Sequence, residues 1–230
     1  MLQRSLTFVL NVFLPGAGFA YCGRPALALM FQLAFYLGLT GLVLSRLLLC
    51  PIGWHLLAGL VAVLVTIGAA CSLGYLTTLG SLKKRLLTLF TFVLLSAAGL
   101  TLTFFYKVTL LGIQVYFVPS PSMTPTLEPG DFILVDTWAY HTKPPLTGDI
   151  VVFQYGEDFA VVKRSADWPG SENAVKDGQL YALGDNPALS TDSRKLGGID
   201  LNKVNGRVCL KLVSWSASDE SWHWRLKTVN

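Results

Sequence analysis

The sequence predicts a protein in two parts, a helical membrane half followed by a mostly antiparallel β domain. The 230-residue chain has a mean hydropathy of +0.51, which is high for a water-soluble protein. All 14 acidic residues lie at or after Glu128, whereas residues 1–127 carry only seven basic side chains. After the last long apolar run, short β-branched and aromatic runs alternate with turns. We therefore expect a membrane region over residues 1–106 and a β-rich domain over residues 107–230.

Three apolar runs, over residues 26–45, 56–76 and 86–106, approach the ~20 residues that a helix needs to cross a bilayer core. A first run, over residues 6–20, is shorter and is interrupted by one proline and two glycines. It fits a short first span, a re-entrant segment or a cleavable signal peptide, and of these we favour an uncleaved segment.

The basic cluster Lys83, Lys84 and Arg85 sets the expected orientation, because cytoplasmic loops are enriched in such residues. The last span then runs outward, and residues 107–230 lie on the far side of the membrane. The N-terminus is outside if the first run crosses and inside if it is re-entrant. Because the excess positive charge belongs to the membrane half, the pI near 8.9 does not indicate nucleic-acid binding.

The β domain is predicted from six runs rich in β-branched and aromatic residues, bounded by Gly and Pro turn signals. Several short strands with turns between them are typical of a small antiparallel sheet or barrel. The runs are Val108–Val118, Phe132–Val135, Asp149–Phe153, Phe159–Val162, Gln179–Leu183 and Val208–Trp215.

The segment Pro119–Asp131, PSPSMTPTLEPGD, is a hydroxyl-rich and proline-rich turn between the two halves. We interpret it as the loop that carries a nucleophile, Ser122. A serine hydroxyl needs a base within hydrogen-bond reach. The three histidines, at 55, 141 and 223, lie far apart and without the spacing of a zinc site, so neither a triad nor a metal is indicated.

A lysine can act as the base if burial disfavours its charged form. Lys163 follows the apolar run Phe159–Val162, and alternation along a strand would place Val161 and Lys163 on one face, with Val162 and Arg164 on the other. Taken singly, Ser122 fits an ordinary turn residue and Lys163 a solvated strand edge. The combination favours catalysis.

Four segments, in order, resemble the sequence boxes of the bacterial type I signal peptidases, also called leader peptidases. These are membrane-bound Ser-Lys proteases that remove signal peptides. PSPSMTPTLEPGDFILV resembles the serine box, GDIVVF the box after it, VVKRSADWPG the lysine box and GDNPALSTDSRKLG the last box. The resemblance covers about Val118–Gly206, and the long membrane half identifies the chain as a divergent, multi-span member. The fold that it implies for the second half is a β catalytic domain of the signal-peptidase type.

The resemblance implies that Ser122 attacks the scissile carbonyl and that Lys163 is the general base. Ser120 and the backbone N–H of Ser122 would form the oxyanion hole, which stabilises charge that develops in the transition state. Ser190 would hold the lysine amine by a hydrogen bond. Met123 would contribute to the substrate pocket.

Three further residues are expected to support the site: Asp192 and Arg194 as a charged pair, and Arg164 beside the lysine. An ordinary surface ion pair is the alternative interpretation of Asp192 and Arg194. The chain departs from the usual boxes at Pro187–Leu189, at Asp167 and Trp168, and at Ser171. These departures leave the Ser-Lys pair intact and are expected to reshape the substrate groove.

The function that the resemblance implies is cleavage of exported preproteins after a small-x-small site, at the outer face of the bacterial cytoplasmic membrane. The expected partners are these preproteins and the lipid bilayer, with no cofactor, metal or nucleic acid. Substrate would bind as an added strand at a sheet edge. Two alternatives remain open: a protease dedicated to one exported substrate, such as a pilin or a secreted peptide, and a non-catalytic membrane protein that binds peptides.

Overall fold

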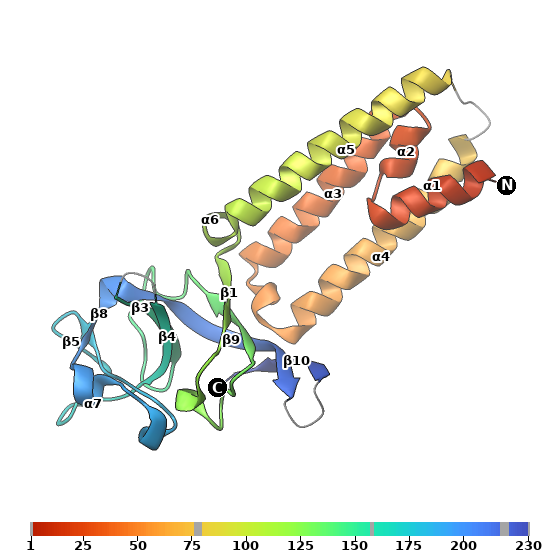
Figure 1. Cartoon of the computed structure of the whole chain (residues 1–230). Helices are drawn as coiled ribbons and strands as arrows, with labels where there is room; N and C mark the ends of the chain where they lie inside the picture. The colour runs from red at the N-terminus through yellow and green to blue at the C-terminus, as the bar shows by residue number, and fades with distance from the viewer. Residues whose placement is uncertain (1, 76–79, 157–158, 217–220, 230) are drawn as a thin grey trace. The chain divides into compact units, whose positions relative to one another are not determined.

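The computed structural model describes residues 2–75, 80–156, 159–216 and 221–229, and the chain divides into two compact units (Figure 1). One unit, Met1–Leu48 with Ile52–Leu110, is helical. The other, Leu49–Pro51 with Leu111–Asn230, contains the described strands. The predicted fold class, a helical N-terminal half followed by a mostly antiparallel β domain, is confirmed.

The helical unit starts with two short helices and continues with three long ones. Among the described residues, α3, α4 and α5 are the helices long and apolar enough to cross a membrane, with mean hydropathies of 2.0, 2.4 and 2.0. They overlap the predicted spans 26–45, 56–76 and 86–106 and begin one to five residues earlier, and residue 76, the predicted end of the second, lies outside the described residues. The helices are α1 (Leu2–Phe13), α2 (Ala17–Tyr21), α3 (Pro25–Leu44), η1 (Leu47–Leu49), α4 (Pro51–Gly74), α5 (Leu82–Phe105) and α6 (Lys107–Leu111).

The first apolar run forms a helical hairpin. The 12 residues of α1 extend about 18 Å, against a bilayer core of about 30 Å. The chain reverses at Gly16 (φ 96°), and the buried Asn11 accepts hydrogen bonds from the N–H groups of Gly16 and Gly18. Asn11 also donates to Ser72 of α4 at 3.1 Å. A Cβ at Gly18 would lie 2.1 Å from Asn11 Nδ2, so only glycine allows this close packing.

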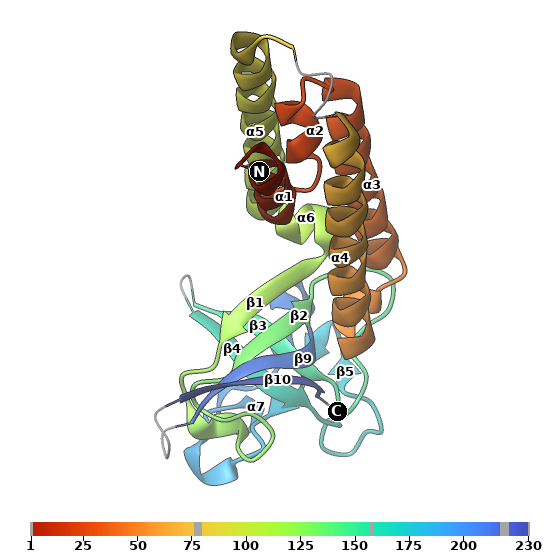
Figure 2. The same cartoon turned by 90° about the vertical axis from the view of Figure 1, so that its right-hand side faces the viewer.

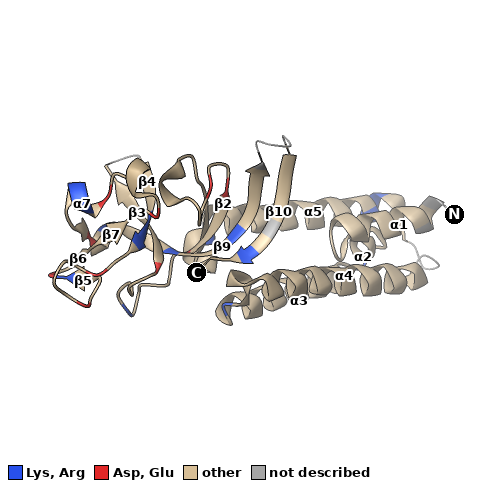
Figure 3. Cartoon of the chain, turned by 90° about the horizontal axis from the view of Figure 1, so that it is seen from below, with Lys and Arg blue, Asp and Glu red and all other residues tan. Residues whose placement is uncertain are grey.

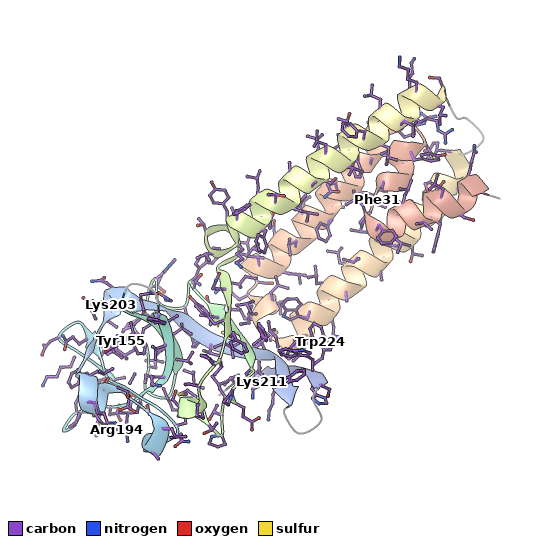
Figure 4. All side chains as sticks on the ribbon, viewed as in Figure 1. Phe31, Tyr155, Arg194, Lys203, Lys211 and Trp224 are labelled. Atoms are coloured by element: carbon purple, nitrogen blue, oxygen red, sulfur yellow. The ribbon has the colours of Figure 1, made fainter. Side chains whose placement is uncertain are left out.

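Aromatic side chains hold this hairpin against the long helices. The ring of Phe19 in α2 lies 5.0 Å from that of Phe31 in α3, which Figure 4 labels. Phe19 also belongs to a buried cluster with Ala28 of α3 and Phe92 of α5. The short α2 is thus the centre of the helical unit's core.

The β unit contains a seven-stranded sheet with the order β1-β2-β9-β3-β4-β7, in which β10 also pairs with β9 (Figure 2). A second sheet has the order β5-β6-β8, and the described pairings are all antiparallel. The strands are β1 (Ile113–Phe117), β2 (Phe132–Asp136), β3 (Ile150–Tyr155), β4 (Phe159–Ser165), β5 (Val175–Lys176), β6 (Gln179–Leu180), β7 (Ala182–Leu183), β8 (Ile199–Asp200), β9 (Val204–Ser216) and β10 (Ser221–Thr228).

The strand predicted to begin at Val108 is wrong over its first residues. Lys107–Leu111 form α6, because the N–H of Leu110 bonds to the carbonyl of Tyr106 and continues the helical turn. Gly112, at φ 64°, ends that helix, and β1 begins after it. The predicted strand Gln179–Leu183 is divided into β6 and β7, and β10 was not predicted.

The central strand β3 is buried on both faces. Ile150 and Val152 pack into one apolar cluster, while Val151 and Phe153 pack into the other. The neighbouring strand β4 follows the same alternation, with Val161 against the second cluster and Val162 against the first, as predicted. This register places Lys163 opposite Val151 and brings it into the interior.

Candidate active site

Ser122 and Lys163 meet in the interior of the β unit. Ser122 lies in the 3-10 turn η3 (Pro121–Met123), and Lys163 lies near the end of β4. Lys163 Nζ donates to Ser122 Oγ at 2.7 Å, and the two side chains are only 3% and 7% exposed. The two residues that the sequence analysis paired as nucleophile and base are therefore in direct contact.

The neighbours of Ser122 differ in their exposure. Ser120 is exposed, and its hydroxyl donates to Ser122 Oγ at 3.1 Å. Met123 is 1% exposed and packs into the apolar cluster with Val118 and Leu127. Met123 can therefore shape a substrate pocket only as part of its floor.

Burial lowers the pKa of Lys163 below its ordinary value, because an ammonium group is poorly solvated in the interior. The carboxylates of Asp192 and Asp185 act in the opposite direction and are outweighed. Each of these carboxylates is itself paired with an arginine, Arg194 for the first and Arg164 for the second. The arginines offset the negative charge that would otherwise keep Lys163 protonated.

Asp192 is the hydrogen-bonding centre of the last box. Its carboxylate, 1% exposed, accepts from Arg194 Nη2 at 2.5 Å and Nε at 2.9 Å, from Gly184 N at 2.9 Å and from Ser190 Oγ at 2.7 Å. Burial alone would raise the pKa of Asp192, but these hydrogen bonds outweigh it and lower the pKa. The predicted pair is thus present, and Arg194 (labelled in Figure 4) reaches it from the surface.

Ser190 was expected to hold the lysine amine. In the structure, the hydroxyl of Ser190 donates to Asp192, and among the described residues the hydrogen bond of Lys163 Nζ goes to Ser122 rather than to Ser190. Ser190 lies close to the pair all the same, because a Cβ at Gly184 would meet Ser190 Oγ at 2.2 Å and the carbonyl oxygen of Ser122 at 2.6 Å. Gly184 is therefore one of the points at which the last box touches the nucleophile loop.

Arg164 ties three segments together. Its Nε and Nη2 donate to the two carboxylate oxygens of Asp185, each at 2.9 Å, and its Nη1 donates to the carbonyl of Gly148 at 3.0 Å. Thr126, in the nucleophile loop, donates to Asp185 at 2.6 Å. Burial would raise the pKa of Asp185, but the hydrogen bonds from Arg164 and Thr126 lower it.

Several of these anchoring residues were not predicted from the sequence. Asn186 donates from its backbone N–H to the carbonyl of Ser122 at 3.1 Å and from its side chain to Thr124 at 2.9 Å. Asp185 and Asn186 form part of the GDN motif, which the sequence analysis matched without assigning these contacts. The available signal was that the polar residues Asp185 and Asn186 follow a glycine, Gly184, in the last of the four sequence boxes.

A third ion pair lies at the far end of the nucleophile loop. Asp131, 1% exposed, accepts from Lys211 Nζ at 2.5 Å and from Ser214 Oγ at 2.6 Å, both on β9 (Lys211 is labelled in Figure 4). Asp131 also accepts from the backbone N–H of Glu128 at 2.9 Å. The end of the loop that follows Ser122 is therefore fixed to β9. A lysine within the apolar run of β9 was the signal for this pair.

Of the residues at which the chain departs from the usual boxes, Pro187–Leu189 lie beside the nucleophile turn. Pro187–Leu189 form a 3-10 turn, η4, that packs against η3, and Leu189 is 60% exposed. The Trp168 ring lies 5.2 Å from that of Tyr181, and Asp167 accepts a hydrogen bond from Thr147. Within the part of the chain that is described, no group of three or more His, Cys, Asp or Glu side chains could hold a metal ion.

Comparison with known proteins agrees with this arrangement. The family described as "Signal peptidase, peptidase S26" matches residues 86–180 and 166–215, which together span more than half of the chain. The chain is 39% identical over 77 residues to a probable signal peptidase I-1 of Synechocystis sp., covering 30% of this chain and 39% of the relative. It is 35% identical over 102 residues to a signal peptidase I of Bacillus caldolyticus, covering 40% of this chain and 56% of the relative.

A signal peptidase I of Pseudomonas fluorescens is 32% identical over 107 residues, covering 39% of this chain and 38% of the relative. The chain thus spans less than two thirds of the length of these relatives. The matched family range includes η3, β4 and the loop that carries Asp192. The chain therefore belongs to the signal peptidase family, peptidase S26.

Proposed function

We propose that this protein is a membrane-bound serine endopeptidase that removes signal peptides from exported preproteins with a Ser-Lys dyad. The observation that carries the proposal is the buried 2.7 Å contact between Lys163 Nζ and Ser122 Oγ. Family membership supports the reaction class, because the curated relatives are signal peptidases. Direct contact between nucleophile and base is a general signature of nucleophilic catalysis.

In the proposed mechanism, neutral Lys163 accepts the hydroxyl proton as Ser122 Oγ attacks the scissile carbonyl. The acyl-enzyme forms, and protonated Lys163 then gives its proton to the leaving amine. Lys163 then deprotonates a water molecule that attacks the acyl carbonyl. The signal peptide leaves with a new C-terminal carboxyl group, and the proton on Lys163 returns to Ser122 Oγ. Ser120 Oγ, 3.1 Å from Ser122 Oγ, would donate to the developing oxyanion together with the N–H of Ser122.

The edge of β4 is the proposed substrate-binding strand. β4 pairs with β3 along its whole length, whereas β7 pairs with it only at Arg164 and Ser165. From Phe159 to Lys163, the second edge of β4 has no partner among the described strands. An extended peptide can form backbone hydrogen bonds there, with its scissile bond beside Lys163. Exposed Leu189, in the turn that packs against η3, would then contact the substrate near the cleavage site.

We further propose that the three long helices anchor the chain in the bacterial cytoplasmic membrane and that the peptidase domain, which begins near residue 107, faces the exterior. The basic residues at the start of α5 support this orientation. A reporter enzyme that works only after export should be active when it is fused after residue 230. A reporter that works only in the cytoplasm should be inactive at the same position, and activity of that second fusion would reverse the orientation.

Cleavage of a preprotein with an Ala-x-Ala site by the detergent-purified full chain tests the function. A Ser45→Ala control removes an exposed hydroxyl that, among the described residues, bonds to the carbonyl of Leu42, and it should cleave as fast as wild type. Ser122→Ala should retain less than about a thousandth of the rate, because no nucleophile remains. Cleavage that persists in Ser122→Ala would refute the mechanism.

Breadth of specificity separates a general peptidase from a protease dedicated to one substrate. The exposed Leu189 turn, which departs from the usual box, favours a restricted groove. A panel of preproteins that differ only around the cleavage site should be cleaved at unequal rates, and Leu189→Ser should narrow those differences. Equal cleavage rates across the panel would exclude the dedicated protease and favour the general peptidase.

A further inference from the structure

One end of the helical unit carries positive charge without an acidic partner in its own half of the chain. Arg24 immediately precedes α3, and Lys83, Lys84 and Arg85 lie in the first turn of α5. Residues 1–127 contain no Asp or Glu, the undescribed positions 76–79 included. In Figure 3, the ribbon segments coloured for Asp and Glu all lie in the β unit.

Arg85 is the unusual member of this group because it is buried. It is 5% exposed, whereas Lys83 and Lys84 are exposed. Its Nε donates to the carbonyl of Tyr21 at 3.0 Å, and its guanidinium carbon lies 4.2 Å from the centre of the Tyr21 ring. Its Nη2 is buried and has no hydrogen-bond partner among the described residues. A buried guanidinium nitrogen without an acceptor is costly, and it therefore points to a ligand.

The end of α2 brings Arg24 to the same place. The N–H groups of Gly23 and Arg24 bond to the carbonyls of Ala20 and Phe19, which closes α2 in a Schellman motif and leaves the carbonyl of Tyr21 to Arg85. A Cβ at Gly23 would lie 3.9 Å from Arg85 Cγ, so the residue before Arg24 lies against the Arg85 side chain. Arg24 itself lies over the Tyr75 ring at 5.0 Å.

The helix termini favour an anion at this point as well. Neither α3 nor α5 has an acidic residue in its first turn, and the side chain of Ser81, the N-cap of α5, makes no capping hydrogen bond. Helix N-termini carry partial positive charge and bind phosphate through their free N–H groups. Basic side chains in that position oppose the helix dipole, and a bound anion removes the conflict.

We propose that Arg85, together with Arg24 and the free backbone N–H groups at the start of α5, binds a phosphate group, and that the group belongs to the headgroup of an anionic phospholipid. A guanidinium is suited to phosphate because its planar donors match two phosphate oxygens. The lipid is the favoured source because both arginines lie at the ends of helices long enough to cross a bilayer, and the ends of a spanning helix reach the headgroups. The site lies outside the family match, which starts at residue 86.

The test measures binding and thermal stabilisation of the full chain in a neutral detergent. Dioleoylphosphatidylglycerol, dioleoylphosphatidylcholine and inorganic phosphate are titrated separately, and retained lipid is counted by native mass spectrometry. Phosphatidylglycerol should bind at least tenfold more tightly than phosphatidylcholine and should raise the Tm. Equal retention of the two lipids would overturn the proposal. Stabilisation by inorganic phosphate, without preference for the anionic lipid, would overturn the lipid assignment.

Three variants localise the effect. Arg85→Gln should weaken phosphatidylglycerol binding about tenfold, and Arg24→Gln should weaken it several-fold. Lys83→Gln removes the same charge from an exposed position in the same turn and should change binding less than twofold. If Arg85→Gln fails to fold, the comparison of Arg24→Gln with Lys83→Gln still decides. Equal losses in Lys83→Gln and Arg24→Gln would mean diffuse attraction to anionic lipid and would refute a defined site.

Discussion

Replacing Lys163 by arginine keeps the charge and removes the base. Lys163 Nζ lies 2.7 Å from Ser122 Oγ in a site where burial lowers the lysine pKa. Arginine has a pKa above ~12, so at pH 8 its neutral fraction is on the order of 10⁻⁴ or less. Because a positioned general base contributes about 10²–10⁴-fold in rate, we expect Lys163→Arg to lose on the order of 10³-fold.

The assay is single-turnover cleavage of an Ala-x-Ala preprotein by the purified chain, from pH 6 to pH 10. The wild-type rate should rise about tenfold per pH unit and then level off, because only the neutral amine accepts the serine proton. Since burial lowers the pKa of Lys163, the plateau should begin below the ordinary lysine value of 10.5. Lys203→Arg makes the same change at an exposed position (labelled in Figure 4) and should behave as wild type.

The same pKa shift predicts how stability depends on pH. The unfolded chain binds a proton at this lysine more tightly than the folded chain, so the cost of burying the charge is fully present below the folded pKa and vanishes above 10.5. Lys163→Met should therefore exceed wild type in Tm at neutral pH, with a difference that shrinks toward alkaline pH.

Near wild-type turnover in Lys163→Arg, or a flat pH–rate profile, would refute lysine as the base.

Two further predictions concern the loop that supports the pair. Asp192→Asn should lower the free energy of unfolding by about 1–3 kcal/mol at pH 7. Because the pKa of Asp192 is lowered in the folded protein, wild type should lose this stability as the pH falls below about 4. The Tm of the variant should fall less steeply over the same acidic range. Equal slopes of Tm against pH in the two proteins would contradict this prediction. Gly184→Ala places a Cβ 2.2 Å from Ser190 Oγ. It should lower the free energy of unfolding by about 1–3 kcal/mol and reduce kcat more than about tenfold. Gly59→Ala, within α4 and without a neighbour within 4 Å, is the matched control and should leave activity unchanged.

The sequence was sufficient to predict the two-part architecture, because charge and hydropathy are segregated along the chain. It was also sufficient to pair Ser122 with Lys163, since the apolar residues before the lysine predict its burial. The helical turn at Lys107–Leu111 could not be predicted, because β-branched and apolar residues there suit either a strand or the continuation of a helix. β10 escaped detection because it alternates tryptophan with polar and basic residues near the end of the chain.

The contacts between loops were beyond sequence reasoning. Ser190 was expected at the lysine amine, but its hydroxyl bonds to Asp192, because that carboxylate is buried and gathers the donors around it. Arg164 was expected in a supporting role, but its link through Asp185 to Thr126 depends on how two loops, 59 residues apart in sequence, fold over β4. Such contacts depend on distances in space that residue spacing does not encode.

The long strand β9 pairs with two strands. One is β2, which follows the nucleophile loop in the chain, and the other is β3, which pairs with the lysine-bearing strand β4. The positions of the candidate serine and lysine are thereby both fixed relative to the same strand, β9. The connection between β4 and β7, residues 166–181, takes no part in that alignment and can change in length without altering the distance between the serine and the lysine. Evolution of new substrate preferences could thus proceed by loop exchange, while the catalytic frame stays intact.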